Sequence, residues 1–279
     1  MSAVINTNIA SLNTQRNLAS SKSGLETSIQ RLSSGLRVNS AKDDASGLSV
    51  ATKMDAQIRG MNVAIRNSND AVSYAQTADG GLSKINDSLQ RMRELAVQGA
   101  NATTDNGSLT TEFKQLQDEI TRVTDNTKFN TKDVLKASAD TVFQVGAGTT
   151  TADQVALTAT NLTSSGTGSA VATAAASASA SVSSAASSKT AIDSIDAAIS
   201  AVNTARADVG AAQNRFESIV SNLQVSVESQ SAAKSRIMDT DFAEETAKLT
   251  RGQILQQAGT AMLAQANSAP NGVLALLRG

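Results

Sequence analysis

The sequence has no cysteine, histidine or tryptophan, and only one proline, one tyrosine and five phenylalanines among its 279 residues. The absence of cysteine excludes disulfides, thiolate nucleophiles and zinc–cysteine sites. The absence of histidine removes the commonest general base and metal ligand of proteins. Basic residues nearly balance acidic ones, 24 against 25, and form no cluster, which argues against nucleic-acid binding. A core with so few aromatic residues must be thin and aliphatic, which suits long helix pairs better than a globule.

Segments that direct a chain to a membrane are also missing. Met1 to Asn8 is polar, with no basic start before an apolar run, so we expect no cleaved signal peptide. No run of about 18 apolar residues occurs, so we expect no membrane insertion. No acidic loop has calcium-binding spacing. We therefore expect no catalytic, cofactor-binding or metal site, and an extracellular destination would need a route without a leader.

What the sequence does contain is a long apolar stripe from Ile192 to Ile237. In alternating steps of three and four, ten of its fourteen positions are large and apolar, which predicts a helix packed along one seam. At about 1.5 Å per residue this helix would be roughly 69 Å long, so it needs a partner of similar length. That partner is predicted to run to about Gln98, with Gly80-Gly81 as a weak point where it could bend.

Shorter helical patterns occur at three other places. Residues 1–38 carry spaced apolar residues among polar ones, and we expect them to stay disordered until they meet a partner. A third helix is predicted around 109–123. A last helix should begin with Asp241 as its N-cap, run to about Asn267 and be stopped by Pro270.

The middle of the chain changes character. Residues 142–145 and 154–162 alternate apolar with polar side chains, which predicts a β-hairpin with a long loop. Residues 166–188 are nearly all Ala, Ser, Thr and Gly, too polar and small to fold alone, so they are expected to be a linker or to extend the next helix. The predicted fold is mainly α: a coiled-coil rod of long helices with a small β-hairpin region.

Several long motifs in this order resemble bacterial flagellin. They are INTNIASLNTQRNL and RLSSGLRVNSAKDDASGLSVA near the start, LQRMRELAVQGAN at 89–101, and GAAQNRFESIVSNL, QILQQAG and PNGVLALLR near the end. The resemblance covers about 1–148 and 190–279, and the short middle indicates a form without outer variable domains. It implies a terminal coiled-coil domain from 1–44 and 239–279. It also implies an inner rod from 45–165 and 189–238, with the linker 166–188 replacing the outer domains.

The resemblance also implies function and partners. Such a chain would polymerise with itself into the filament that drives swimming, and would leave the cell through the flagellar export apparatus. Its other partners would be a flagellar export chaperone and the hook-junction and filament-cap proteins. The polymerisation core would comprise apolar residues from both chain ends: Ile5, Ile9, Leu12, Leu25, Ile29, Leu32, Leu36, Ile254, Leu255, Met262, Leu263, Val273, Leu274 and Leu277.

One stretch resembles a recognition site for the vertebrate Toll-like receptor 5. Carried over residue by residue, the flagellin motif at 90–97 implies receptor contacts at Gln90, Arg91 and Leu95. Glu112 joins them by counting back from the stretch at 119–123. The same residues also fit a plainer interpretation, in which the apolar ones belong to the helix seam and the arginines are solvated.

Three other functions are less well supported by the sequence. A hook–filament junction protein resembles flagellin at both ends, but the matches at 89–101 and at the C-terminal end favour flagellin. Some flagellins carry a metalloprotease, which needs two helix-spaced histidines that this chain lacks. A coiled-coil chemoreceptor would need a transmembrane segment.

Overall fold

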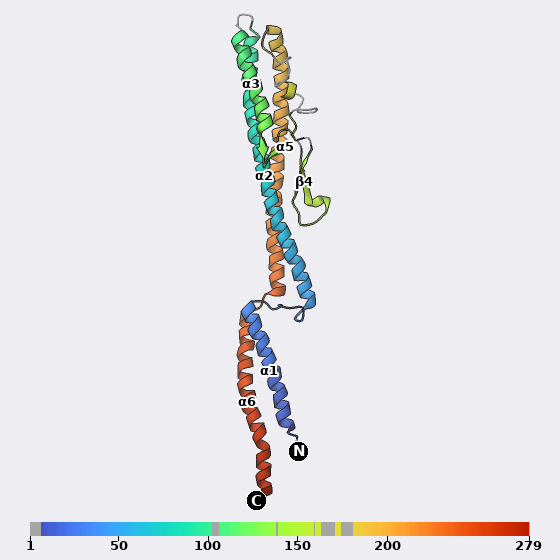
Figure 1. The fold of residues 1–279 in the computed structure, drawn as a ribbon, viewed down its shortest axis with the longest axis vertical. Helices are drawn as coiled ribbons and strands as arrows, with labels where there is room; N and C mark the ends of the chain where they lie inside the picture. Colours follow the sequence, from blue (N-terminus) through green and yellow to red (C-terminus); the bar gives the residue numbers. More distant parts are fainter. Residues whose placement is uncertain are drawn as a thin grey trace. The chain divides into compact units, whose positions relative to one another are not determined.

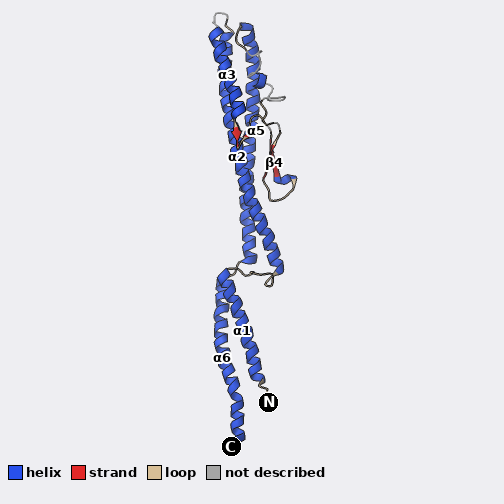
Figure 2. Ribbon diagram, in the orientation of Figure 1, coloured by secondary structure: helices blue, strands red, loops and turns tan. Residues whose placement is uncertain are grey.

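The computed structural model describes residues 7–101, 106–137, 139–158, 160–162, 171–173 and 181–278, with only the backbone from residue 269 onward. Long helices dominate it, and the strands are few and short (Figure 2), so the predicted mainly-α fold is confirmed. The chain divides into two compact units. The first is formed by Met1–Ala56 with Ser229–Gly279, and the second by Gln57–Glu228.

The first unit pairs two helices from opposite ends of the chain. Helix α1 (Ile9–Ser34) and helix α6 (Phe242–Arg278) lie side by side (Figure 1). They run antiparallel, because Gly35 after α1 accepts a hydrogen bond from the Thr240 N–H just before α6, whereas Asn8 before α1 reaches Ala266 late in α6. The predicted partner of the N-terminal segment is thus present within the same chain.

The ends of these helices follow local chemistry. Gly35 has a φ of 71°, which suits glycine, and its N–H donates to the Arg31 carbonyl at 2.8 Å to close α1. The Asp241 carboxylate accepts from the N–H groups of Ala243 and Glu244 at 2.8 and 3.2 Å, so the predicted N-cap of α6 is confirmed. The predicted stop at Pro270 is wrong, since α6 continues to Arg278.

The second unit is organised by three helices. Helix α2 (Ala45–Gly99) and helix α5 (Ala185–Met238) run antiparallel, as ion pairs from Asp79 to Arg206 and from Arg93 to Asp196 show. Helix α3 (Asn106–Asn126) joins their core. The predicted seams supply fully buried side chains: Leu82, Ile85, Leu89, Met92, Phe113, Ile120, Ile195, Val202 and Phe216.

Helix α2 runs unbroken through Gly80 and Gly81, where the sequence raised the possibility of a bend. The second glycine has a packing reason. A Cβ atom at Gly81 would lie 2.8 Å from Leu135 Cδ1 and 3.0 Å from Thr127 Oγ1, so only glycine lets this segment approach so closely.

Two small antiparallel strand pairs complete the second unit. Strand β3 (Thr141–Gln144) pairs with β4 (Gln154–Leu157), with a short 3-10 helix, η1 (Thr151–Asp153), in the connecting loop. This pair confirms the predicted hairpin, although its second strand ends before 162. Strands β1 (Lys128–Phe129) and β2 (Lys132–Asp133) form a pair that the sequence did not indicate.

Aromatic contacts join the hairpin to the helices. Phe143 of β3 makes edge-to-face contacts with Tyr74 of α2 and Phe216 of α5, with ring centroids 5.9 and 5.7 Å apart. Much of the 166–188 tract lies outside the described residues. Of the rest, 171–173 are helical, 181–184 are non-helical, and 185–188 are the first residues of α5.

Candidate functional site

Large apolar side chains are exposed along both helices of the first unit. Six residues predicted for the polymerisation core have about half or more of their surface exposed: Ile9 69%, Leu12 50%, Ile29 50%, Ile254 60%, Leu255 49% and Met262 62%. Phe242, which the sequence did not single out, is 56% exposed. Seven large apolar side chains are therefore exposed on this one helix pair.

Other predicted core residues face inward instead. Leu25, Leu32, Leu36 and Leu263 are half-buried. Ile5 lies outside the described residues, as do the side chains of Val273, Leu274 and Leu277. The structure therefore divides the described residues of the predicted core into half-buried residues and residues that are about half exposed or more.

Two glycines that the sequence did not single out set how closely α1 and α6 pack. A Cβ atom at Gly252 would lie 3.3 Å from Leu25 Cβ, and one at Gly259 would lie 3.0 Å from Leu18 Cδ1. The two glycines are seven residues apart on α6, and the two leucines are seven residues apart on α1. Each leucine therefore packs onto one glycine with the same heptad spacing. The sequence contains a signal for this packing, which is the equal spacing of the leucines in α1 and the glycines in α6. It becomes visible only when the two segments are aligned antiparallel.

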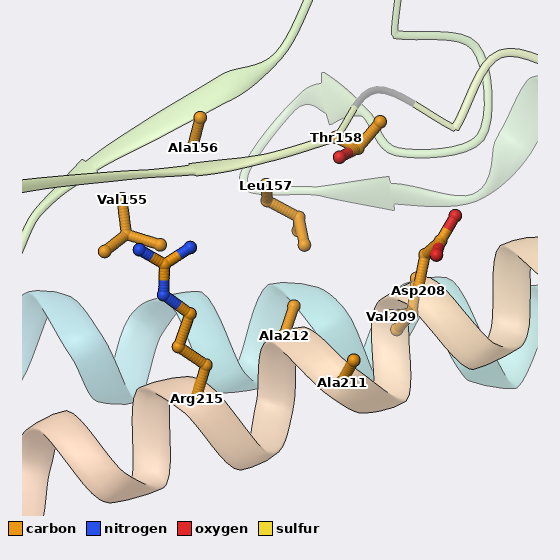
Figure 3. A pocket seen from close by; sticks show the side chains of 9 residues that line it. All are labelled: Val155, Ala156, Leu157, Thr158, Asp208, Val209, Ala211, Ala212 and Arg215. Carbon is orange, nitrogen blue, oxygen red and sulfur yellow. The ribbon is translucent and has the colours of Figure 1, made fainter.

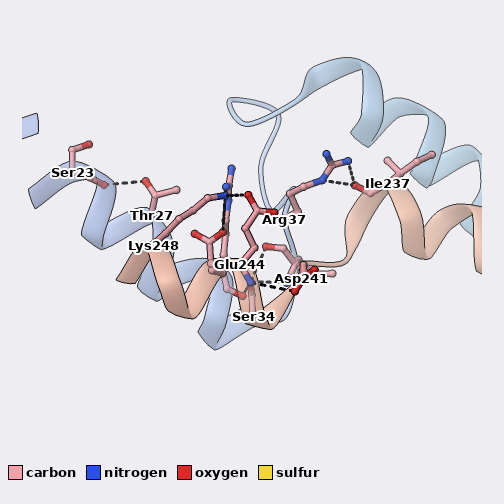
Figure 4. A network of polar contacts seen from close by, with 11 residues as sticks. Ser23, Thr27, Ser34, Arg37, Ile237, Asp241, Glu244 and Lys248 are labelled. Carbon is pink, nitrogen blue, oxygen red and sulfur yellow. Dashed lines mark hydrogen bonds and ion pairs between the residues drawn. The ribbon is translucent and has the colours of Figure 1, made fainter. Parts of the chain in front are cut away.

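A buried acid lies between the same helices. Only 4% of the Glu245 side chain is exposed, and its carboxylate pairs with Arg31 at 3.8 Å and Lys248 at 3.5 Å. Figure 4 shows the neighbouring contact between Lys248 and Glu244, and this hydrogen bond raises the pKa of Lys248. Removing the cations would leave a buried charge uncompensated, which is strongly unfavourable.

The segment between α1 and α2 is held by its own polar groups. Arg37 donates to the Ile237 carbonyl at 2.8 Å (Figure 4). Hydrogen bonds from Ser40 to the Asp43 carboxylate lower the pKa of Asp43. The Asp44 side chain accepts from the Gly47 N–H at 2.8 Å, at the start of α2. The Arg37, Asp43 and Asp44 side chains thus all have hydrogen-bond partners within the chain.

The residues of the possible receptor surface are in part brought together. Arg91 of α2 pairs with Glu112 of α3 and with Glu94, each at 2.8–2.9 Å, and these hydrogen bonds raise the pKa of Arg91. Gln90 is exposed and lines a groove of about 490 Å³ with Arg93, Glu94 and Val97. Leu95 is only 1% exposed, so its side chain packs in the core and supports this surface from beneath.

A second hollow lies between β4 and α5, with a volume of about 260 Å³. Figure 3 shows Val155 and Leu157 pointing from the strand toward the helix, with Arg215 beside Val155. Asp208 lies at the other end of the hollow. Its lining is mainly aliphatic and has one basic and one acidic side chain.

Neither membrane-spanning nor metal-binding features are found where the structure describes the chain. Within those residues, no helix is long and apolar enough to cross a bilayer. The same residues hold no group of three or more acidic side chains that could share a metal ion.

Comparison with known proteins finds matches along most of the chain. Residues 5–140 match the family model of the bacterial flagellin N-terminal helical region, and residues 192–277 match that of the C-terminal helical region. The chain is 44% identical to a flagellin of Halalkalibacterium halodurans, over 99% of this chain and all of the relative. It is 40% identical to a flagellin of Bacillus subtilis, over 98% of this chain and 99% of the relative. A crystal structure of Bacillus cereus flagellin is 30% identical, with a TM-score of 0.48, and covers 57% of this chain and 88% of its own.

Proposed function

This chain belongs to the bacterial flagellins, the structural subunits of the flagellar filament, and we propose that it polymerises through the outward apolar faces of α1 and α6. The family places it in an extracellular filament that serves motility. The observation that carries the proposal is the exposure of six predicted core residues on one helix pair, among them Ile9 and Met262.

The energetics favour burial by another copy. Covering a fully exposed Leu, Ile or Met side chain is worth about 1.5–3 kcal/mol, so several such residues together offset a large part of the cost of association. A second copy presents the same residues from both chain ends. In this proposal residues 1–44 and 239–279 form the filament core, and 45–165 with 189–238 form the inner rod. The linker 166–188 stands where outer domains would be.

Electron microscopy tests the proposal directly. The full chain and a shortened chain lacking 1–38 and 240–279 would be compared under salting-out conditions. We expect long tubular filaments from the full chain and none from the shortened chain, whose Tyr74 fluorescence should still report a packed second unit. Full chains that only capped preformed filaments, without extending them, would favour the junction-protein alternative.

Recognition by Toll-like receptor 5 is a second proposal. What supports it is the exposed ion pair between Arg91 and Glu112, which joins two helices on one face beside Gln90. Leu95 contributes by holding that face in place. Arg91→Ala should sharply weaken signalling by the monomer while leaving its fold intact, because exposed ion pairs contribute less than about 1 kcal/mol. Lys84→Ala, which breaks an exposed pair with Asp87 elsewhere on α2, is the matched control. Unchanged signalling by the Arg91 variant would count against the proposal.

The export route follows from the same family membership. We propose that the chain leaves through the flagellar export apparatus, with a cytoplasmic export chaperone covering its apolar C-terminal part until then. Hook-junction and filament-cap proteins would contact it at the two ends of the filament. Deleting the chaperone should lower the amount of this chain in the culture medium and raise its aggregation inside the cell, as immunoblots of the two fractions would measure.

A further inference from the structure

Helix α6 contains a residue that should interrupt it. Pro270 has no main-chain N–H, so within a helix the carbonyl four residues earlier loses its hydrogen-bond donor. In α6 that carbonyl belongs to Ala266. The helix nevertheless continues to Arg278, which raises the question of what satisfies this carbonyl.

The missing donor is supplied by Asn8, from the other end of the chain. Its side-chain Nδ2 donates to the Ala266 carbonyl at 2.7 Å. The Oδ1 atom of the same side chain accepts from the Ser11 N–H at 3.0 Å and caps the start of α1. An asparagine amide can do both, since it carries a donor and an acceptor, whereas an ionised aspartate can only accept.

We infer that Asn8 is the positioning residue that lets α6 pass through Pro270, because its amide replaces the N–H that the proline lacks. The last turns of α6 are then held in helical form only while α1 is docked. Those turns carry Val273, Leu274 and Leu277. In the polymerisation proposal, on which this consequence rests, the C-terminal residues become available to a neighbouring copy only after the two chain ends have paired.

A four-member cycle tests the inference: the natural chain, Asn8→Asp, Pro270→Ala and the double variant. Amide hydrogen exchange of residues 267–278 is measured on the full chain, both unassembled and in filaments. Asn8→Asp keeps the cap of α1 but removes the donor, so it should speed exchange of these amides by about tenfold, the effect of one lost hydrogen bond. Pro270→Ala restores the main-chain donor, so Asn8→Asp should then change exchange less than about twofold.

Ser11→Ala is the matched control. Ser11 bonds to the Asn267 side chain at 2.7 Å, next to the same carbonyl, and this contact does not involve the proline. Ser11→Ala should therefore change the amide exchange of residues 267–278 by the same factor in the natural chain and in the Pro270→Ala variant. An equal effect of Asn8→Asp in both backgrounds, or equal exchange in all four variants, would overturn the inference. If Asn8→Asp prevented α1 and α6 from pairing, restored pairing in the double variant would support the inference. Failure of the double variant to restore pairing would overturn the inference. A chain that formed no filaments would contradict the polymerisation proposal alone, since the cycle is also read on the unassembled chain.

Discussion

Two adjacent glycines in α2 have different surroundings and should respond differently to substitution. A methyl group at Gly80 would meet nothing within 4 Å, whereas one at Gly81 would press on Leu135 and Thr127. Gly80→Ala should stabilise the second unit by about 0.5–1 kcal/mol, because alanine favours a helix more than glycine does. Gly81→Ala should destabilise it, since both neighbours must move. Urea unfolding followed by the fluorescence of Tyr74, the single tyrosine of a chain without tryptophan, measures both. Equal effects of the two changes would contradict this account.

The ion pair between Arg93 and Asp196 gives the second unit a dependence on acid. The hydrogen bond from Arg93 holds the pKa of Asp196 below its ordinary value. A lowered pKa in the folded state means that the stabilisation is fully present above about pH 3.8 and is lost as the pH falls through the folded value. Asp196→Asn should cost less than about 1 kcal/mol at neutral pH, because the pair is half exposed. The unfolding free energy of the Asp196→Asn variant should fall less steeply below pH 4 than that of the natural chain. Arg93→Gln should reproduce this pH curve, and a curve like that of the natural chain would argue against the pair.

At the scale of elements, the sequence predicted the helices whose buried face follows the helical period. It did not predict the segments that break local rules for helix ends and turns. The apolar seams predicted α2, α3 and α5, because one face of each is covered along its length. Pro270 was misread as a stop because the donor that compensates for it lies more than two hundred residues away, at Asn8. Strands β1 and β2 were missed because their turn has φ values of 45° at Asn130 and 67° at Thr131, and threonine there is not a usual hairpin signal.

The pairing of α1 with α6 should depend on the α6 glycines that contact the leucines of α1. Gly252→Val places a branched side chain where a Cβ atom already lies 3.3 Å from Leu25 Cβ, so the helices must separate. We expect a loss of about 1–3 kcal/mol from the pair, as for other overpacked sites. Gly24→Val is the control, since a Cβ atom on this glycine of α1 meets nothing within 4 Å. Thermal unfolding by circular dichroism, with limited proteolysis of residues 9–34, compares the two. Similar unfolding of both variants would show that the close approach does not matter.

At the scale of the whole molecule, the sequence predicted which segments gather apolar residues but not which way each residue faces. Leu25 and Ile29 lie one turn apart on α1, yet the structure half-buries the first and leaves the second 50% exposed. Leu95 was predicted as a receptor contact by resemblance and is buried, because resemblance transfers positions without their exposure. Which side chains of α1 and α6 point outward depends on how the two helices pair. The local sequence of either chain end does not determine it.

The outward faces therefore provide the sharpest test of assembly. Ile254 is 60% exposed on α6, so Ile254→Glu should leave the α1–α6 pair and the second unit folded. A buried carboxylate in the filament would lack a partner, so polymerisation should need at least about tenfold more protein, because burying an unpaired charge is costly. Sedimentation of filaments gives the critical concentration, and Tyr74 fluorescence checks the fold. Gln253→Glu adds the same charge at an exposed position of α6 about 100° round the helix from Ile254, without removing an apolar side chain, and it should polymerise far better. Equal critical concentrations for the two variants would mean that charge on α6, and not the apolar face around Ile254, governs assembly.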